Sequence, residues 1–208
     1  MNRPTPTSGA IGDGDSQLVP GDGGIAPAPT DASARVAAFD ATVDSWFDPL
    51  RGRPVPDRVF EIASHLGDWG LIWNFLTVAL ALRSDDDAHR APRLVSAFAL
   101  ESLIVNQGIK RLFRRSRPEG RPEMAGRLRE PVTTSFPSGH ASSAAFATVV
   151  ICDGNPGLRP VVASLAVIVA TSRIHTRMHH PSDVVAGAGL GWILGHLALV
   201  ISRRTMER

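Results

Sequence analysis

Five apolar stretches occupy most of the chain after residue 58. They cover about residues 60–82, 92–109, 140–152, 159–171 and 184–201. A helix needs about 20 mostly apolar residues to cross a bilayer, and the first and fifth stretches clearly meet that length. The pattern predicts an all-α transmembrane bundle of five to six helices. A soluble bundle with buried helices is the alternative that hydropathy leaves open.

The segment before the first stretch predicts a further helix over residues 33–50. Its apolar residues fall three and four positions apart, the spacing of an amphipathic helix: Val36, Phe39, Val43, Trp46 and Phe47. Such a helix can lie on a membrane surface or pack on the core of its own domain, and both placements stay open. If this helix crosses the membrane or takes the place of a membrane-spanning helix, the bundle has six helices rather than five.

The two ends of the chain are polar. Residues 1–32 are rich in Gly, Pro, Ser, Thr and Asp, and such a composition predicts a disordered tail without the apolar core of a signal peptide. The expected organisation is therefore a tail at 1–32, an amphipathic helix and linker at 33–57, a membrane domain at 58–202 and a basic tail at 203–208.

Composition excludes only a few classes of protein. One cysteine excludes an internal disulfide framework and a cysteine-cluster metal site, and the net charge is only +2 with a pI of about 9.4. The basic residues gather between Lys110 and Arg129 rather than along a whole face. We expect no nucleic-acid partner.

Chain direction predicts where the polar clusters meet. The turn-forming residues Asp153–Gly157 make the third and fourth stretches a helical hairpin. If the five stretches alternate in direction, the end of the second, the start of the third, the end of the fourth and the start of the fifth share one face. Three polar segments occupy those junctions: Lys110–Pro118, Pro137–His140 and Ser172–Asp183.

Two features of these segments favour an anion. Lys110, Arg117 and Arg173 are cations, and the arginine fork suits phosphate. Pro137–His140 is expected to open a helix, whose unpaired N–H groups attract negative charge. Ser138 adds a hydroxyl donor there, and Gly139 permits close approach of the backbone. Together they predict a pocket for a phosphate-like dianion.

Two histidines at this face supply reactive groups. His179 and Asp183 are four residues apart, and a carboxylate on one ring nitrogen fixes the tautomer and raises the basicity of the other. His179 is then able to attack phosphorus. His140, on a different helix, is placed to protonate the leaving alkoxide as a general acid. The pattern predicts phosphoryl transfer without a metal ion or other cofactor.

The remaining histidines have simpler interpretations. We expect His175 and His180 to be surface or capping residues, since neither has the partner spacing of His179. A metal site of His175, His179 and Asp183 is conceivable, but three crowded cations would repel a divalent ion. The basic run around Arg111–Arg117 is also compatible with a solvated or membrane-surface face.

Four polar residues lie outside the three segments. Glu101 and Asn106 lie in the second apolar stretch, where polar residues at membrane depth often matter for function, and an interhelical hydrogen bond is the expected role. His65 and Asp68 are expected to be structural or interfacial.

The three segments carry a family signature. The chain resembles the type 2 phosphatidic acid phosphatase superfamily, whose motifs are K-x6-RP, PSGH and SR-x5-H-x3-D. The first corresponds to Lys110 with Arg117-Pro118, the second to Pro137–His140, and the third to Ser172-Arg173, His179 and Asp183. All eleven specified positions are present in order. The resemblance covers about residues 58–202.

The resemblance implies a role for each residue. His179 is the nucleophile that forms a phosphohistidine, Asp183 orients it, and His140 protonates the leaving group and later activates water. The implied phosphate-binding residues are Lys110, Arg117, Ser138, Gly139 and Arg173. No metal is used in that family.

The expected function is hydrolysis of a membrane lipid phosphate or pyrophosphate, of the phosphatidic acid, phosphatidylglycerol phosphate or polyprenyl pyrophosphate type. A soluble acid phosphatase or vanadate-dependent haloperoxidase is one alternative, and a non-catalytic membrane protein that binds anionic lipid is another. The resemblance further implies a multi-pass protein of the cell membrane with an extracytoplasmic site. The sequence does not specify an oligomeric state.

Overall fold

The computed structural model describes residues 30–119 and 133–206, and every regular element in those two ranges is a helix. The all-α prediction is therefore confirmed. Most of the predicted tail at 1–32 lies outside the described residues. The main helices are α1 (Asp31–Ser45), α2 (Pro54–Gly67), α3 (Leu71–Ala81), α4 (Asp85–Leu103), α5 (Gly139–Gly154), α6 (Arg159–His175) and α7 (Pro181–Met206).

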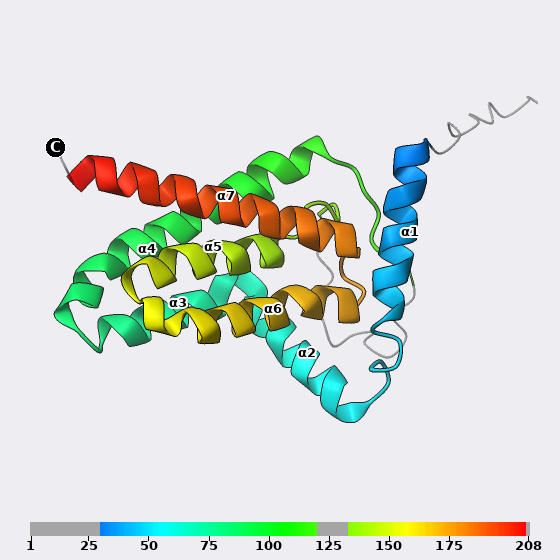
Figure 1. Ribbon diagram of the computed structural model, residues 1–208, viewed down its shortest axis with the longest axis horizontal. Helices are drawn as coiled ribbons and strands as arrows, with labels where there is room; N and C mark the ends of the chain where they lie inside the picture. Colours follow the sequence, from blue (N-terminus) through cyan, green and yellow to red (C-terminus); the bar gives the residue numbers. More distant parts are fainter. Residues whose placement is uncertain (1–29, 120–132, 207–208) are drawn as a thin grey trace, which may run out of the picture.

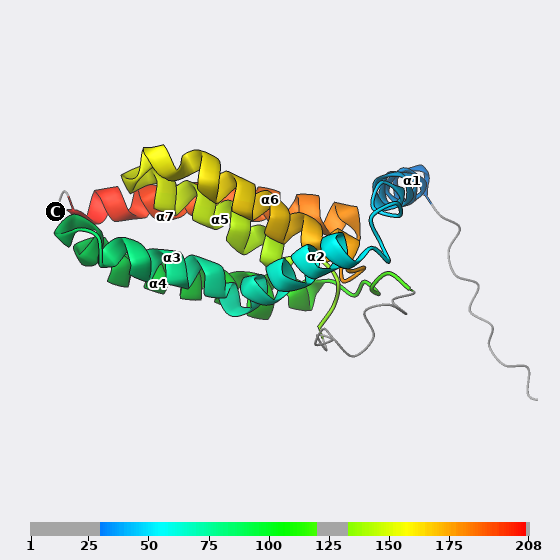
Figure 2. The ribbon, with the colours of Figure 1, turned by 90° about the horizontal axis from the view of Figure 1, so that it is seen from below.

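The helices form an elongated bundle of two layers. Helices α5, α6 and α7 make one layer, and α3 and α4 make the other (Figure 2). Within the first layer α5 lies between α6 and α7 (Figure 1) and packs against both. The predicted hairpin is present, since α5 ends at Gly154 and α6 begins at Arg159 after a short 3-10 turn. α7 continues to Met206, so Arg203 and Arg204 lie on the helix.

Close packing of α5 on α7 depends on small residues. A Cβ atom added to Gly187 would lie 2.3 Å from the carbonyl oxygen of Ser138, and one added to Gly191 would lie 1.9 Å from that of Ser142. Both distances are far below van der Waals contact. The two glycines thus let the helix backbones touch, as small residues do in membrane helix pairs.

Apolar side chains fill the space between the layers. Trp73 and Leu80 of α3 and Phe98 of α4 meet Phe146 of α5 in one buried cluster. The rings of Phe98 and Phe146 lie edge to face with centroids 5.3 Å apart, a favourable aromatic geometry. This core holds the two layers together along their length.

The first apolar stretch is not one helix, so the expectation that residues 60–82 form a single helix long enough to span a membrane was wrong. Helix α2 ends at Gly67, and a turn at Asp68–Gly70 separates it from α3. Trp69 and Gly70 both have positive φ, 55° and 65°, a conformation that interrupts a right-handed helix. Hydropathy reports how apolar a segment is and not its backbone angles.

Within the described residues, two helices are long and apolar enough to span a membrane, Pro156–His175 and Pro181–Thr205. The fourth apolar stretch was judged short, but the helix extends past both of its ends. Apolar side chains on the outside of these two helices are more than half exposed: Val161, Val167, Val185, Ile193, Leu197 and Ile201. Such a surface is suited to lipid contact.

Helix α1 crosses one end of the bundle at a steep angle (Figures 1 and 2). Val43 of α1 and the following Phe47 pack against buried Ile174 and Val184, whereas Val36 and Phe39 are exposed. The one buried residue of α1 is Asp40. The helix therefore packs on the domain core through Val43 and buries the Asp40 carboxylate. Val36 and Phe39 remain exposed.

Candidate active site

The three polar segments meet at the end of the bundle where α6 ends and α5 and α7 begin. The Ser138 amide donates to the carbonyl oxygen of Asp183 at 3.0 Å, and the His179 amide donates to that of Arg173 at 3.0 Å. A guanidinium nitrogen of Arg117 donates to the Met178 carbonyl at 2.5 Å. The convergence predicted from alternating chain direction is thus present.

Lys110 reaches this end through a change of helix type. A π turn at Ile104–Gly108 follows α4, and a 3-10 turn at Ile109–Leu112 then carries the lysine. Its side chain is buried, and burial lowers the pKa of Lys110 to about 8, with a further contribution from Arg117. The lysine therefore carries its charge at neutral pH but loses it a little above.

The two motif arginines are held by neutral oxygens. Arg173, buried in the last turn of α6, donates to the Ser64 hydroxyl of α2. Arg117 donates to the carbonyl oxygens of Met178 at 2.5 Å and Thr133 at 3.0 Å. These contacts hold both guanidinium groups at this end of the bundle, near His179.

The second motif forms the helix start that its sequence predicts. Ser138 is the N-cap of α5, and its hydroxyl accepts from the Ala141 amide at 3.4 Å. Pro137 lies one residue before the cap rather than in the first turn. The N-terminus of α5 therefore points its partial positive charge and its free amides into the same end of the bundle.

His179 and Asp183 are both buried and lie close together. The His179 Nδ1 atom is 3.7 Å from Asp183 Oδ2, longer than a direct hydrogen bond, and Nδ1 has no hydrogen-bond partner among the described residues. Burial lowers the pKa of His179, and the nearby cations Arg173, Arg117 and Lys110 lower it further. The imidazole is therefore neutral at pH 7.

The Asp183 carboxylate accepts hydrogen bonds from three donors that are not specified positions of the family motifs. A guanidinium nitrogen of Arg115 donates to Oδ1 at 2.5 Å, and the Ser135 hydroxyl donates to Oδ2 at 2.5 Å. The backbone amide of His180 donates to Oδ2 at 2.9 Å. Charge-assisted bonds of this kind hold a carboxylate ionised and in one orientation.

Arg115 also connects the site to the N-terminal helix. Its second guanidinium nitrogen donates to Asp40 Oδ2 at 2.6 Å, and Asp40 accepts from the Ser182 amide at 2.7 Å. The sequence placed Arg115 in a run compatible with a solvated face, and that interpretation was wrong for this residue. Nothing in the sequence links positions 40, 115 and 183.

His140 forms a second histidine–carboxylate pair. Its Nε2 atom lies 3.2 Å from Asp68 Oδ1 and 3.1 Å from the Ser64 carbonyl oxygen. A Cβ added to Gly67 would lie 2.4 Å from the imidazole Cδ2 of His140, so the ring packs directly against the backbone at the end of α2. The expected structural role of Asp68 was therefore incomplete, because this carboxylate contacts a candidate site residue.

His175 is buried, and its interpretation as a surface or capping residue was wrong. Its Nε2 atom lies 2.8 Å from Asp57 Oδ1, and its ring stacks on Phe60 with centroids 4.4 Å apart. The alternative metal site with His179 and Asp183 is not assembled. In residues 30–119 and 133–206, no three His, Cys, Asp or Glu side chains are grouped so that they could hold a metal ion.

Glu101 and Asn106, the polar residues of the second apolar stretch, form different kinds of hydrogen bond. The Ser142 hydroxyl of α5 donates to Glu101 Oε1 of α4 at 2.5 Å, which confirms the interhelical bond expected for Glu101. Asn106 instead donates to the Ser102 hydroxyl of its own helical segment at 3.1 Å. His180 lies at the rim of the site, with Nε2 3.3 Å from the Ser116 carbonyl oxygen.

Comparison with known proteins relates the chain to one family. The sequence model of the PAP2 superfamily matches residues 91–207. Decaprenylphosphoryl-5-phosphoribose phosphatase of Mycolicibacterium smegmatis is 34% identical over 148 residues, which are 71% of this chain and 80% of that protein. The Mycobacterium tuberculosis H37Rv protein of the same name is 36% identical over 137 residues, 64% of this chain and 72% of that one.

A solved structure shows the same fold. The crystal structure of a transmembrane PAP2-type phosphatidylglycerolphosphate phosphatase from Bacillus subtilis matches with a TM-score of 0.57 and 22% sequence identity. The match covers 84% of this chain and 88% of that one. The described residues therefore share the helical fold of that transmembrane phosphatase.

Proposed function

Because this chain belongs to the PAP2 superfamily, we propose that it is a membrane phosphatase that hydrolyses a lipid phosphate through a phosphohistidine intermediate. One observation carries the proposal. A buried, neutral His179 lies beside the ionised Asp183 and is surrounded by Arg173, Arg117 and Lys110. A nucleophile and a cationic cradle in one place are what transfer of a phosphoryl dianion requires.

The first step forms the intermediate. Asp183 faces Nδ1 of His179, so the other ring nitrogen, Nε2, attacks phosphorus. The bond from phosphorus to the lipid oxygen breaks, and that oxygen takes a proton from His140. The 3.7 Å distance between His179 Nδ1 and Asp183 Oδ2 shortens as substrate binds, because catalytic hydrogen bonds are often long in enzymes without substrate.

The second step returns the free enzyme. His140, now without its proton, takes one from a water molecule, whose oxygen attacks the phosphohistidine. The phosphorus–nitrogen bond breaks, and inorganic phosphate leaves. Lys110, Arg117 and Arg173, together with Ser138, Gly139 and the amides at the start of α5, stabilise charge on the phosphoryl oxygens in both steps.

Asp68 acts in this scheme as a positioning residue. Its carboxylate holds one ring nitrogen of His140 at 3.2 Å, which leaves the other for the leaving oxygen and the water. A carboxylate in this position fixes the imidazole tautomer and stabilises the protonated form that donates the proton. The site then contains two histidine–aspartate pairs, one for attack and one for proton transfer.

The proposed substrate is a phosphate monoester on a polyprenyl-linked sugar. Support comes from the two mycobacterial relatives, whose names specify decaprenylphosphoryl-5-phosphoribose. Phosphatidylglycerol phosphate, phosphatidic acid and polyprenyl pyrophosphate are the other lipid phosphates to be compared. The exposed apolar faces of α6 and α7 would keep the lipid chain in the bilayer while its phosphate enters the site.

The proposed location is the cell membrane, with several spans and the site on the extracytoplasmic side. Arg90 and Arg93 lie in the first half of α4, and Arg203 and Arg204 lie in the last turn of α7. Both of these helix ends are at the end of the bundle opposite the start of α7 (Figure 1). Short basic segments favour the cytoplasm, so this arrangement supports an outward-facing site.

Phosphate release by the detergent-purified protein tests the function. The panel contains a polyprenyl-linked pentose phosphate, phosphatidylglycerol phosphate, phosphatidic acid, a prenyl pyrophosphate and a soluble phosphomonoester, each with a chelator present. We expect release that needs His179 and survives chelation, greatest for the polyprenyl sugar phosphate. Failure to release phosphate from any of these lipids, with lipid binding intact, would favour a non-catalytic binding protein.

A further inference from the structure

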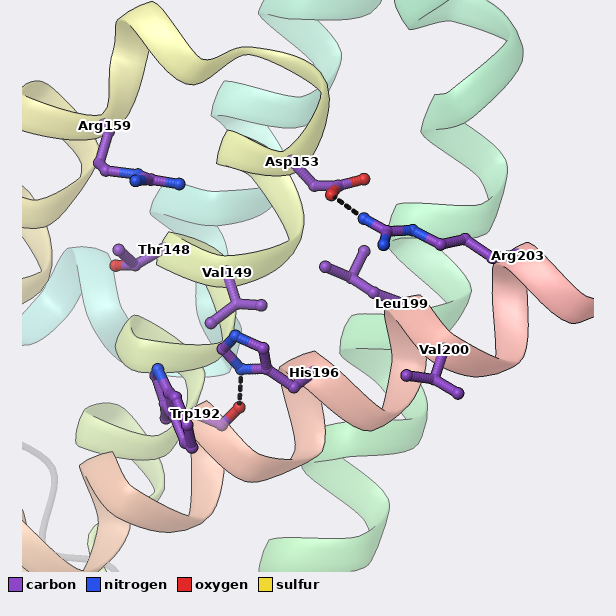
Figure 3. Close-up of a pocket in the computed structure, with 9 residues that line it drawn as sticks. All are labelled: Thr148, Val149, Asp153, Arg159, Trp192, His196, Leu199, Val200 and Arg203. Atoms are coloured by element: carbon purple, nitrogen blue, oxygen red, sulfur yellow. Dashed lines mark hydrogen bonds and ion pairs between the residues drawn. The ribbon is translucent and has the colours of Figure 1, made fainter.

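A groove of about 440 Å³ lies between α5, the start of α6 and the second half of α7 (Figure 3). It is far from the candidate active site. His140 and Asp153 lie thirteen residues apart on α5, which is about 20 Å at the helical rise per residue. The groove is therefore a separate feature at the opposite end of the bundle.

One end of the groove is charged. Arg203 and Asp153 form an ion pair there at 2.6 Å, and Arg159 lines the groove on the side of Asp153 away from Arg203 (Figure 3). Arg159 makes no hydrogen bond or ion pair with another residue in the described part of the chain. Two guanidinium groups and one carboxylate leave an excess positive charge, and the guanidinium fork matches the oxygens of a phosphate.

A second cavity extends this positive region. Its volume is about 300 Å³, and it shares Asp153, Leu199 and Arg203 with the first groove while adding Arg90 and Arg93 of α4. Four arginines and one acidic residue therefore line the two cavities around the last turns of α7.

The rest of the first groove is mostly apolar, with Thr148 and His196 as its two polar residues. Val149 of α5 and Leu199 and Val200 of α7 line its middle, and Trp192 lies at the end away from Arg203 (Figure 3). Trp192 and Arg203 are eleven residues apart on a helix that is long and apolar enough to span a membrane, about 16 Å along its axis. The groove thus runs from a charged helix end toward the middle of a proposed span.

We propose that this groove binds one anionic phospholipid from the leaflet opposite the active site. Arg159 binds the headgroup phosphate, and an acyl chain lies along Val149 and Leu199 toward Trp192. A soluble anion would satisfy the arginines but would leave the apolar wall uncovered. The inference rests on the proposed membrane placement of α6 and α7, and it is independent of the chemistry at His179.

Lipid retention by purified protein tests this inference. The wild type and the Arg159→Gln and Arg204→Gln variants are reconstituted with phosphatidylcholine and phosphatidylglycerol, and bound lipid is counted by native mass spectrometry. Arg204 is the matched control, since it is an exposed cation one residue beyond Arg203 and lines neither cavity. We expect Arg159→Gln to retain phosphatidylglycerol about tenfold more weakly, and Arg204→Gln to match the wild type.

A fluorescence measurement locates the acyl chain. Phosphatidylglycerol with brominated chains should quench the wild-type tryptophan emission more strongly than brominated phosphatidylcholine does. The difference should disappear in a Trp192→Phe protein, which keeps all the arginines. Quenching that is the same for the two lipids, or unchanged by the substitution, would overturn the proposed path of the chain.

Two results of the retention assay would contradict the inference. They are equal phosphatidylglycerol retention by wild type and Arg159→Gln, and equal retention of both lipids by the wild type. Phosphate release from the substrate panel is measured on the same samples. Loss of that activity in every sample would count against the proposed function, while the retention ratios would still decide this inference.

Discussion

The Nε2 atom of His140 lies 3.2 Å from Oδ1 of Asp68. Asp68 lies in the turn between α2 and α3, outside all three family motifs. This turn also brings the Ser64 carbonyl oxygen to His140 and the Ser64 hydroxyl to Arg173. The end of α2 therefore supports both a proposed proton donor and a phosphate-binding residue.

Replacing Asp68 with Asn should lower kcat roughly 10- to 100-fold, less than loss of the general acid itself, which costs about 10²–10⁴-fold. The neutral amide no longer stabilises a protonated His140. The loss should shrink for an aryl phosphate, whose leaving group needs little protonation. Steady-state kinetics with an alkyl and an aryl phosphate check this.

The neighbouring His65→Gln variant is the control for Asp68. Its Nδ1 atom is 3.7 Å from Asp68 Oδ2, and its side chain is nearly half exposed. We expect near wild-type kcat for both substrates. An equal loss for both substrates in Asp68→Asn would indicate a structural role for the carboxylate and contradict the positioning role.

Replacing Arg115 with Gln should destabilise the protein by roughly 2–4 kcal/mol, because it leaves the carboxylates of Asp183 and Asp40 without their shared cation. Activity should fall as well, since Asp183 loses one of its three donors. Chemical denaturation and phosphate release measure the two effects. Arg111→Gln is the control, because Arg111 is exposed and, among the described residues, its side chain bonds only to Gln107, four residues earlier. An equal effect in this variant would refute the assignment.

Replacing Gly191 with Ala should destabilise the α5–α7 contact by about 1–3 kcal/mol, the usual cost of overpacking. The new methyl group would meet the Ser142 carbonyl oxygen, which is backbone and cannot turn away. Gly189→Ala on the same helix has open space and should be neutral or slightly stabilising, because alanine favours helix. Thermal unfolding in detergent compares the two variants, and equal midpoints would contradict the predicted close contact.

The pH dependence of kcat/KM should have two distinct limbs. His179 must be neutral to attack, and its pKa is lowered by burial, so activity should persist to a pH below the ordinary histidine value before it falls. Lys110 must be charged, and its pKa is lowered to about 8, so with an aryl phosphate, whose leaving group needs little protonation by His140, activity should fall as pH rises through that value. Lys110→Arg should move the alkaline limb upward, and an unmoved limb would assign it to another group.

The sequence predicted those parts of the candidate site that depend on residues close together in the chain. The helix start at Pro137–His140 follows from residue type, and the alternation of helices brought Lys110 and Arg173 to one end. The bend at Trp69 was not predictable, because it depends on positive φ in an otherwise apolar run.

The supporting residues could not be predicted because their partners are distant in sequence. Asp40 and Arg115 are 75 residues apart, and Asp68 and His140 are 72 apart by number. No periodicity or spacing relates such pairs, and each carboxylate looks like an ordinary polar residue until the helices pack. His175 was misjudged for the same reason, since its partner Asp57 lies on α2.

Trapping the covalent intermediate tests the central claim most directly. Wild-type and His179→Ala proteins are mixed with substrate, quenched within one turnover in alkali, where phosphohistidine is stable, and examined by peptide mass spectrometry. The account predicts one added phosphoryl group on His179, absent from His179→Ala and accumulated in His140→Ala when the substrate is an aryl phosphate. A phosphoryl group on another residue, or full turnover without any adduct, would contradict it.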